Sequence, residues 1–315
     1  MNKYFVRRSH CPGCQSPERF DLVKASLTKP PLLDYLLSFY AAQGGVDLEY
    51  LHEQDYVLSE CLNCGLIYQQ EIPGEWLLHK LYEEWIDPTQ VFESIERRRP
   101  IGYFSGLGKE VISIVRHFDC LPSELRFLDF GMGWGHWCRI AQALGCEVYG
   151  MEVSAPRINY ARQTGIHVID YEEIATLRFD FINTEQVIEH LAEPRKTIDY
   201  LRQSLKSGGI LKISVPDGAD VKQKLKRWNW QAPKASRDSL NPVAPLEHIN
   251  CFNRDVLVRV ARDLSLEPID YRSFQGNMET VQRLIVIFRR HWNRFRRNQV
   301  QPSSIRLFFR AVDLG

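Results

Sequence analysis

The sequence predicts an α/β protein, in which a parallel sheet with helices on both faces follows a small metal-binding module. Three observations favour this fold class: strand-like and helical segments alternate from residue 126, a glycine-rich turn follows the first of those strands, and two pairs of cysteines lie near the N-terminus. The chain has 315 residues. That length suits one large domain with a small partner, or two medium domains.

The cysteine pairs define the predicted module at residues 1–75. They occur in "CPGC" (Cys11, Cys14) and "CLNCG" (Cys61, Cys64). Two C-x-x-C turns offer four thiolates to one tetrahedral Zn²⁺, which closes the coordination sphere and makes the zinc structural. Residues 15–60 separate the pairs, so this segment must fold as an insert, and "KPPLLDYLLSFYAA" has the apolar spacing of a helix. The alternative is two unrelated buried pairs.

Composition indicates where the protein works. The N-terminus has no apolar core of a signal peptide, and no uncharged apolar run approaches the ~20 residues that span a bilayer. A cytoplasmic location is expected, where thiols stay reduced. The other cysteines are therefore expected to be buried thiols: Cys120, Cys138, Cys146 and Cys251. A formal net charge of +1 provides no general attraction to nucleic acid or to an anionic membrane.

The rest of the chain divides into linking helices at 76–125 and a main domain at 126–315. The linker contains two amphipathic segments, "EWLLHKLYEEWI" and "YFSGLGKEVISIVRHF". The predicted strands of the main domain are "RFLDF", "CEVYGM", "IHVI", "FDFIN", "GILKISV" and "LEPIDYR", with a last strand at 304–312. Ligands of such sheets bind at the carboxyl ends of the strands.

The glycine-rich turn lies in "FLDFGMGWGHW", residues 127–137. Its spacing is G-x-G-x-G, whereas a dinucleotide turn has G-x-G-x-x-G. Asp129 precedes it and would repel a diphosphate but attract an ammonium group. Glu152 ends the next strand, where an acid can bind both ribose hydroxyls. S-adenosylmethionine (SAM) therefore suits this turn better than NAD. The alternative is a tight strand–helix connection without a ligand.

The segments "LDFGMGWG", "VYGMEVS", "FDFINTEQVIEHL" and "LKSGGILKISVPD" occur in this order and resemble the class I SAM-dependent methyltransferases. The resemblance covers residues 126–274 and, more loosely, 304–312. The front, with "YVLSECLNCGLIY" followed by "LYEEW", is similar to the zinc-binding region of sugar and cell-surface-glycan methyltransferases. The resemblance implies a Rossmann-like sheet of seven strands, the last antiparallel.

The same resemblance implies a set of cofactor-binding residues. One group would lie under the methionine moiety, Glu152 would bind the ribose, a pair after the third strand would border the adenine, and a pair after the fourth strand would line the methyl-facing side. In that order the groups are Asp129, Gly131, Gly133 and Gly135; Glu152; Asp170 and Tyr171; Glu185 and Gln186. His190, which follows in the same motif, is expected to orient its loop or to be purely structural.

The long segment at 216–250 has no clean period and is predicted to be a substrate lid. Its end, "PLEHINCF", contains Glu247 and His248. In the sugar C-methyltransferases that it resembles, a Glu-His pair at this place serves deprotonation, which makes His248 the candidate base. If the stretch is extended, the side chain of Glu247 points away from His248 and would grip a substrate hydroxyl. The alternative is that His248 only secures the lid.

Two segments rich in arginine and lysine can be interpreted either as ordinary surface or as binding sites. Residues 278–298 combine an apolar helical stripe with arginines, which could contact an anionic membrane or a partner protein, although packing on the chain's own domain is the commoner reason. The run from Lys222 to Arg227 could meet a phosphate of the substrate, but it is more often a solvated helix face.

The predicted function is SAM-dependent methyl transfer to a small-molecule or glycan acceptor, with a (nucleotide-)sugar or cell-surface polysaccharide precursor as the leading class. An RNA base methyltransferase with an N-terminal zinc ribbon is the first alternative, and near-neutral charge and the motif "NTEQ" disfavour it. A SAM-binding interaction protein without turnover is the second. The presence of both Asp129 and Glu152 argues against it.

Overall fold

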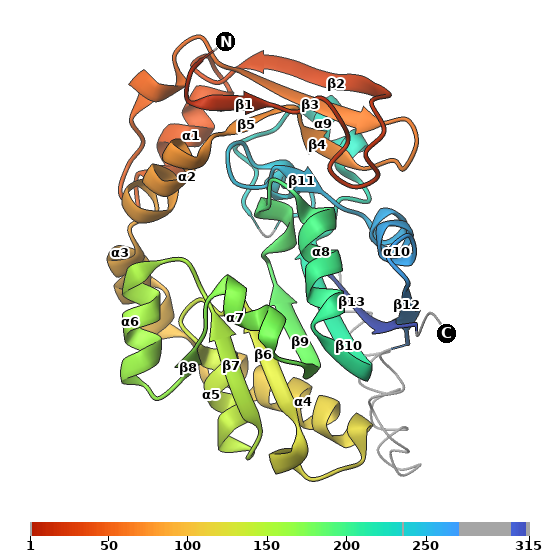
Figure 1. Ribbon diagram of the computed structural model, residues 1–315. Coiled ribbons are helices and arrows are strands. Elements are labelled where there is room, and N and C mark those ends of the chain that lie inside the picture. The colour runs from red at the N-terminus through yellow and green to blue at the C-terminus, as the bar shows by residue number, and fades with distance from the viewer. Residues whose placement is uncertain (1, 235, 271–303, 313–315) are drawn as a thin grey trace, which may run out of the picture.

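A computed structural model describes residues 2–234, 236–270 and 304–312. Within these residues the chain forms two parts, each built on its own β-sheets, and one part lies above the other in Figure 1. The upper part holds a four-stranded sheet of order β11-β4-β3-β2 and a two-stranded sheet, β1-β5. The lower part is built on a seven-stranded sheet of order β12-β13-β10-β9-β6-β7-β8. Residues 278–298, for which the sequence predicts a basic helix, lie outside the described residues.

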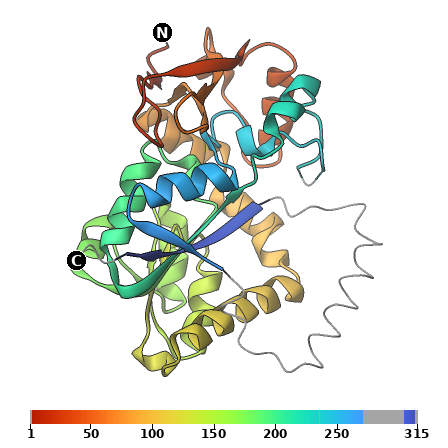
Figure 2. The ribbon, with the colours of Figure 1, turned by 90° about the vertical axis from the view of Figure 1, so that its right-hand side faces the viewer.

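The seven-stranded sheet confirms the predicted fold class. Strands β6 to β10 run parallel to their neighbours within this group, and β13 runs antiparallel to both β10 and β12. β13 lies in the sheet between β12 and β10, and Figure 2 shows it in dark blue at the edge that faces the viewer. The strands are β6 (Arg126–Phe130), β7 (Glu147–Met151), β8 (His167–Val168), β9 (Phe179–Glu185), β10 (Leu205–Pro216), β12 (Leu266–Ile269) and β13 (Ser304–Ala311).

Helices cover both faces of this sheet, because successive strand residues point to opposite faces. Phe127 belongs to a core with one set of helices, and its neighbour Leu128 belongs to a core with the other set. The first set is α4 (Ile101–Phe118), α5 (His136–Ala143) and α6 (Ala155–Gln163). The second set is α7 (Tyr171–Thr176), α8 (Pro194–Gln203) and α10 (Arg254–Arg262). The result is a three-layer sandwich.

The N-terminal module has its own apolar core and a helix in its insert. That helix, α1, buries Leu32, Leu36 and Tyr40 in this core. The helical segments that lead to the main domain begin with a short α-helix followed by one turn of π-helix. The elements are β1 (Phe5–Arg7), β2 (Arg19–Ser26), α1 (Leu32–Tyr40), η1 (Leu48–Leu51), β3 (Asp55–Cys61), β4 (Ile67–Gln69), β5 (Glu71–Pro73), α2 (Glu75–Lys80), η2 (Leu81–Trp85), α3 (Pro88–Ser94), η3 (Glu96–Arg98) and η4 (Pro122–Glu124).

The segment predicted as a lid is a structural part of the N-terminal module. It contains α9 (Val221–Arg227), η6 (Asn241–Val243) and β11 (Asn250–Cys251), and η5 (Ile188–His190) lies in contact with β11. Trp230, Leu240 and Val243 are buried in the same core as α1. Its apolar residues pack into a core formed by residues far away in the sequence. The segment therefore shows no regular spacing of hydrophobic residues. Figure 1 shows α9 and β11 beside the upper sheets.

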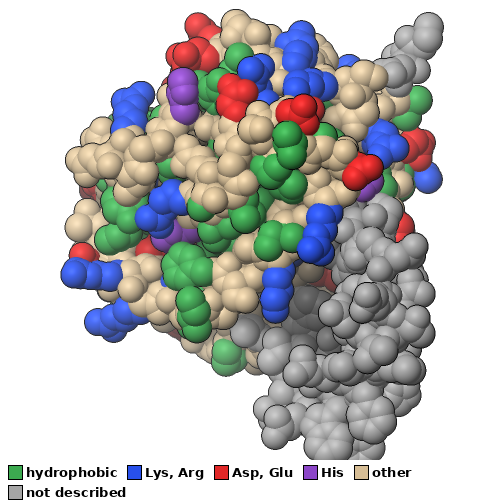
Figure 3. Space-filling view, turned by 90° about the horizontal axis from the view of Figure 1, so that it is seen from below, with side chains coloured by type: hydrophobic (Ala, Val, Ile, Leu, Met, Phe, Trp, Pro, Cys, Tyr) green, Lys and Arg blue, Asp and Glu red, His purple; other side chains and the backbone are tan. Residues whose placement is uncertain are grey.

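The structure tests two predictions made from composition, on the burial of four cysteines and on membrane-spanning helices. Cys138, Cys146 and Cys251 are buried as predicted, but Cys120 is exposed, so that prediction was wrong for Cys120. It lies just after α4, in the turn before η4, where the chain is at the surface. Among the described residues, no helix is long and apolar enough to cross a membrane. On the face seen in Figure 3, basic and acidic side chains are interspersed over the described residues.

A buried ion network links α4 to the centre of the large sheet. Lys212 on β10 is 1% exposed, and its Nζ lies 2.6 Å from Glu110 Oε1 and 2.7 Å from Glu185 Oε2. Arg306 on β13 lies 2.9 Å from Glu110 Oε2 and 3.6 Å from Glu185 Oε1. Two acids and two bases therefore neutralise one another beside the end of β9, where Glu185 lies.

We expect Lys212→Met to lower the free energy of unfolding by about 3–5 kcal/mol, because the change removes one partner of the buried Glu110 carboxylate. Urea denaturation measures the loss. Lys206→Met is the matched control, since Lys206 pairs with Asp180 at 2.7 Å with its side chain 38% exposed, and its loss should cost less than about 1 kcal/mol. Equal losses in the two variants would contradict the importance of this network.

Candidate functional site

The glycine turn after β6 has the backbone that its sequence predicts. Gly131, Gly133 and Gly135 have φ values of 74°, 55° and 68°, in the left-handed region that favours glycine. A Cβ at Gly131 would lie 2.5 Å from Val187, and one at Gly135 would lie 2.1 Å from Ile166. The turn ends at Gly135, which caps the N-terminus of α5. A side chain at Gly131 or Gly135 would therefore collide with its neighbour, whereas at Gly133 only the positive φ disfavours other residues.

Asp129 lies beneath this turn and is 3% exposed. Its carboxylate accepts a hydrogen bond from Asn183 Nδ2 at 2.7 Å and one from Cys138 Sγ at 3.5 Å. Burial raises the pKa of Asp129 to about 6, while the hydrogen bond from Asn183 and the charge of Lys212 oppose that rise. The group is therefore ionised at neutral pH but titrates close to it, and a bound cation would favour its ionised form.

Glu152 joins the glycine turn to the end of β7. Its Oε2 accepts the backbone N–H of Gly133 at 2.9 Å. Its Oε1 accepts the N–H groups of Val153 and Ser154 at 2.8 and 3.1 Å. Asp129 and Glu152, predicted to bind the methionine moiety and the ribose of one cofactor, thus lie at the same turn. Glu152 also fixes the turn itself, since three backbone donors converge on it.

The bulky residues of the turn have definite places. Met132 is buried beneath Gly150, where a Cβ would lie 2.1 Å from its sulfur. Trp134 packs against Phe92 of α3 and Tyr160 of α6, with ring centroids 4.5 and 5.4 Å apart. A helix of the predicted linker at 76–125, α3, therefore contacts the turn directly, together with α6 of the main domain.

The other predicted cofactor residues lie at the carboxyl ends of their strands. Asp170 caps α7, accepting the N–H of Glu173 at 2.8 Å. Tyr171 stacks on Tyr200 with centroids 4.2 Å apart. Glu185 accepts a hydrogen bond from Ser214 and belongs to the Lys212 ion network. The exposed residue Gln186 follows Glu185 directly.

A second group of side chains lies beyond the end of β9. The potential ligand atoms of Glu189, His190 and His248 all lie within 4.8 Å of one another. The two imidazole centroids are 4.8 Å apart. Glu189 is 1% exposed, and neither of its carboxylate oxygens has a hydrogen-bond partner in the described structure. The Nε2 atom of His190 lies 3.8 Å from Glu189 Oε1. A buried carboxylate without a hydrogen bond is costly, so its presence beside two imidazoles indicates a functional site.

The hydrogen bonds of the two histidines orient them alike. A carbonyl oxygen can only accept, so Nδ1 of His190 donates to the Glu247 carbonyl at 2.9 Å, and Nδ1 of His248 donates to the Asn241 carbonyl. The Nε2 lone pair of each ring is then free to accept a proton or bind a cation. Burial lowers the pKa of His190 to about 4 and that of His248 well below its usual value. Burial raises the pKa of Glu189 to about 8.

Residues of the N-terminal module complete this group. Tyr40 on α1 donates to Glu247 Oε1 at 3.0 Å, and Tyr82 in the π-helical turn lies with its hydroxyl 3.0 Å from His190 Nδ1. Leu246 has a φ of 71°, so the chain turns before Glu247 and is not extended as predicted. Glu247 nevertheless faces Tyr40 while His248 faces His190.

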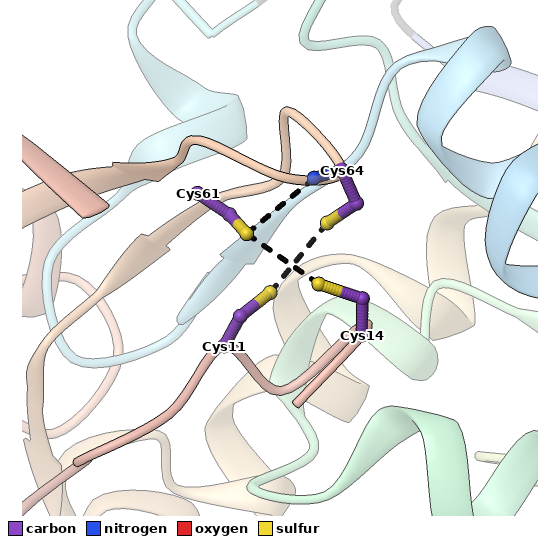
Figure 4. A group of neighbouring side chains, drawn as sticks. All are labelled: Cys11, Cys14, Cys61 and Cys64. Atoms are coloured by element: carbon purple, nitrogen blue, oxygen red, sulfur yellow. Dashed lines mark hydrogen bonds between the residues drawn. The ribbon is translucent and has the colours of Figure 1, made fainter. Parts of the chain in front are cut away.

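The four predicted cysteine ligands form one cluster (Figure 4). The sulfurs of Cys11 and Cys64 lie 3.6 Å apart, and those of Cys14 and Cys61 lie 3.5 Å apart. A tetrahedral site with bonds of about 2.3 Å has sulfurs about 3.8 Å apart, so the spacing fits zinc. The N–H groups of Gly13 and Cys64 point at two of the sulfurs, at 3.4 and 3.5 Å. These bonds stabilise thiolates.

Comparison with known proteins is consistent with this geometry. Residues 78–270 match the family model described as a methyltransferase domain. A ubiquinone biosynthesis O-methyltransferase of Cereibacter sphaeroides is 27% identical over 224 residues, which cover 62% of this chain and 82% of that protein. The enzyme of the same name from Nitrobacter winogradskyi is 30% identical over 151 residues, covering 43% of this chain and 56% of its own length.

Among solved structures, a magnesium protoporphyrin IX methyltransferase from Synechocystis PCC 6803 with bound SAH has a TM-score of 0.50 at 14% identity. The match covers 76% of this chain and 100% of that one, and it supports the fold alone. The family match covers most of the chain, so the protein belongs to the methyltransferase-domain family. It is a SAM-dependent methyltransferase of class I.

Sequence reasoning missed Glu189 as a site residue and gave His190 only an orienting or structural role. The sequence feature that could have indicated this site is the pair Glu189-His190, which begins four residues after Glu185. It becomes informative only when His248, from a distant segment, is placed beside it. Tyr40 and Tyr82 were missed as well. They lie on helical segments whose apolar spacing gives no sign of a hydroxyl function.

SAM affinity should depend on the charge of Asp129. The carboxylate binds a cation in its ionised form, and its pKa is about 6. Affinity should therefore be full at about pH 7 and above, be about half at pH 6, and fall by up to about tenfold per unit below that. Asp129→Asn should weaken SAM binding by about 1–3 kcal/mol and remove this dependence. Calorimetry between pH 5 and 8 measures both effects.

The control for that experiment is Asp180→Asn, because Asp180 lies at the opposite end of β9 from the site. It should leave SAM affinity and its pH dependence unchanged. Wild-type affinity that is flat across this range, or an NAD affinity equal to that for SAM, would refute the assignment of Asp129.

Proposed function

We propose that this protein transfers the methyl group of SAM to a hydroxyl oxygen of a small molecule. The observation that carries the proposal is the group formed by Glu189, His190 and His248, just beyond the end of β9. β9 is the neighbour, in the sheet, of β6, the strand that leads into the glycine turn. The relatives named above are O-methyltransferases, which supports an oxygen acceptor. A hydroxyl is a weak nucleophile while it keeps its proton, so methyl transfer to it needs a proton acceptor nearby.

The proposed reaction is an in-line displacement. The acceptor oxygen forms a bond to the methyl carbon, the bond between that carbon and the sulfonium sulfur breaks, and S-adenosylhomocysteine leaves. The hydroxyl proton passes to Nε2 of His248, whose ring is held by its Nδ1–H bond to Asn241. Glu247, held by Tyr40, would grip a second hydroxyl of the acceptor. Collinear alignment supplies the rest of the rate enhancement.

Within this reaction, we propose a (nucleotide-)sugar or a cell-surface polysaccharide precursor as the acceptor. The support is the resemblance of the front of the chain to sugar and glycan methyltransferases, together with a hydrogen-bonding group, Glu247, beside the base. Incubation with SAM and panels of nucleotide sugars, lipid-linked glycans and ring-hydroxylated aromatic compounds, read by mass spectrometry, tests it. A methyl added to an aromatic hydroxyl alone would keep the reaction and replace the acceptor class. A methyl on RNA would reject both.

A bound divalent cation is a second way for the same residues to activate the hydroxyl. It is favoured by Glu189, whose two oxygens are buried without partners, because a cation would supply the missing contacts and lower the pKa of the hydroxyl. Glu189, His190 and His248 would be its ligands. Turnover that requires added Mg²⁺ or Mn²⁺ after dialysis would favour this route over direct transfer to His248.

We also propose that Cys11, Cys14, Cys61 and Cys64 hold a structural zinc ion. Four thiolates leave no open position, so the ion would take no part in the reaction. Its role would be to fix the turns that carry the cysteines against α10. Gly13 is tightly placed there, with a side-chain atom of Val260 3.3 Å from a Cβ at this position, and a Cβ at Gly65 would contact Val256 at 3.6 Å.

His248→Gln should lower turnover by about 10²–10⁴-fold, because a proton-transfer group contributes that much. SAM affinity should hardly change. Since burial lowers the pKa of His248, wild-type turnover should hold down to pH values well below 6.5 before it falls, and that fall should be absent in the variant. Steady-state kinetics with the acceptor from the screen measures these effects.

Two comparisons complete that test. Glu247→Gln should raise the KM for the acceptor more than it lowers turnover, as expected of a group that grips the substrate. His167→Gln is the control, since His167 lies on the edge strand β8 and packs against Tyr149. Near wild-type turnover of His248→Gln would assign the histidine to structure only.

Cys61→Ser should abolish stoichiometric zinc and destabilise the N-terminal module, because zinc binding is coupled to folding in segments with a small core. Metal analysis by atomic emission and a thermal melt measure the two effects. Cys120→Ser, at an exposed cysteine, should change neither. Purified wild-type protein that holds no metal, with all four thiols open to titration, would refute the zinc proposal.

A further inference from the structure

A guanidinium from the N-terminal module reaches both segments that carry the histidines. Arg8 follows β1 directly. Its Nη2 donates to the carbonyls of Leu191 and Ala192 at 3.2 and 2.8 Å. Its Nη1 donates to the carbonyl of Ile249 at 3.2 Å and to Asn250 Oδ1 at 3.0 Å. One charged side chain thus joins the chain just after His190 to the chain just after His248.

Gln69, the last residue of β4, holds the second of these segments from the other side. Its Nε2 donates to the carbonyls of Ala244 and His248 at 2.9 and 3.1 Å, and its Oε1 accepts the N–H of Leu246 at 3.4 Å. Gln69 is 2% exposed. A buried amide that satisfies three backbone groups defines the path of the turn between η6 and β11, from which Glu247 and His248 project.

Asn250 connects the two segments to each other. It lies in β11, 1% exposed, opposite Tyr68 of β4. Its Nδ2 donates to the carbonyl of Leu191 at 2.7 Å and to that of Glu189 at 3.3 Å. The backbone that carries Glu189 and His190 is therefore fixed relative to the backbone that carries His248.

The chemistry of Arg8 suits fixation of backbone better than charge neutralisation. Within the described part of the chain it makes no ion pair, and its two Nη atoms donate to backbone carbonyls and one amide oxygen, whereas its buried Nε has no partner there. Burial lowers its pKa to about 10, so it stays charged at neutral pH. Hydrogen bonds from a charged donor are about twice as strong as neutral ones. Arg8 Nη1 also donates to the carbonyl of Gln69 at 3.4 Å. The other four acceptors of its guanidinium lie within two residues of a site histidine.

We propose that Arg8 and Gln69 are positioning residues for the methyl transfer: the N-terminal module sets the relative placement of His190 and His248 through their backbone. The inference rests on the proposed function. A shift of about 1 Å in a reacting group can cost about 10²-fold in rate. Loss of either side chain should therefore act on turnover, and the SAM site at β6 and β7 should be unaffected because neither residue contacts it.

The experiment compares Arg8→Met, Arg8→Lys, Gln69→Leu and the control Arg7→Met. Arg7 is exposed, and its side chain bonds to Gln70 inside the module. We expect kcat to fall about 10–100-fold in Arg8→Met and Gln69→Leu, with SAM affinity within twofold of wild type. Arg8→Lys should recover part of kcat, and Arg7→Met should match wild type. Unchanged kcat in Arg8→Met, or a parallel loss of SAM affinity, would overturn the proposal.

Hydrogen exchange gives a second readout that needs no acceptor and no activity. In Arg8→Lys, which keeps the charge if Arg8→Met fails to fold, amide exchange should rise in peptides covering 186–193 and 244–251 and stay unchanged in 126–152. Exchange that is equal in all three regions would overturn the proposal. If exchange rises as expected but wild-type protein methylates nothing in the acceptor panels, the proposed function fails while the role of Arg8 in placing the histidines stands.

Discussion

The pairing of β4 with β11 is the contact on which the arrangement of the molecule depends. Tyr68 lies opposite Asn250, and Ile67 lies opposite Cys251. The pairing is short, but it joins the strand that follows one cysteine turn to the strand that follows His248. Through it, the segment between β10 and α10 becomes part of the N-terminal core, and that core becomes one wall of the site. The two predicted domains therefore share their hydrophobic interior.

The site has two halves with different electrostatics. In the cofactor half, the buried acid Asp129 is satisfied by Asn183 and Cys138, and its environment holds the carboxylate ready for a cation. In the proposed acceptor half, the buried acid Glu189 has no hydrogen-bond partner among the described residues, and burial raises its pKa to about 8. A satisfied acid stabilises a rigid binding site, whereas an unsatisfied one is retained where a proton or a ligand must be exchanged.

Local features could be predicted from the sequence, because their causes are local. Gly131, Gly133 and Gly135 mark a left-handed turn in which other residues are strained, and the cysteine spacing marks a metal-binding turn. The alternation of apolar runs gave the strands and their order in the chain. The antiparallel last strand followed from resemblance to a family, since periodicity alone carries no strand direction.

Features that depend on distant pairing could not be predicted in this way. Trp230 and Val243 are buried against α1, and a segment whose core lies in another part of the chain has no period that identifies its partner. Glu189 looked like an ordinary turn residue until its neighbour His248 was placed. The φ of Leu246 is another case, because Gln69 holds the backbone around it through hydrogen bonds.

The β4–β11 pairing also constrains how the chain is made. Residues 67–69 emerge from the ribosome long before residues 250–251, and five strands of the large sheet lie between them in the sequence. During much of translation, the β4 edge of the N-terminal sheet therefore has no strand paired to it. Contacts between residues so far apart in the sequence form late in folding. An early-bound metal would keep the nascent β3–β4 hairpin in shape during that interval. The N-terminal module can therefore be completed only after β6 to β10 of the large sheet have been synthesised.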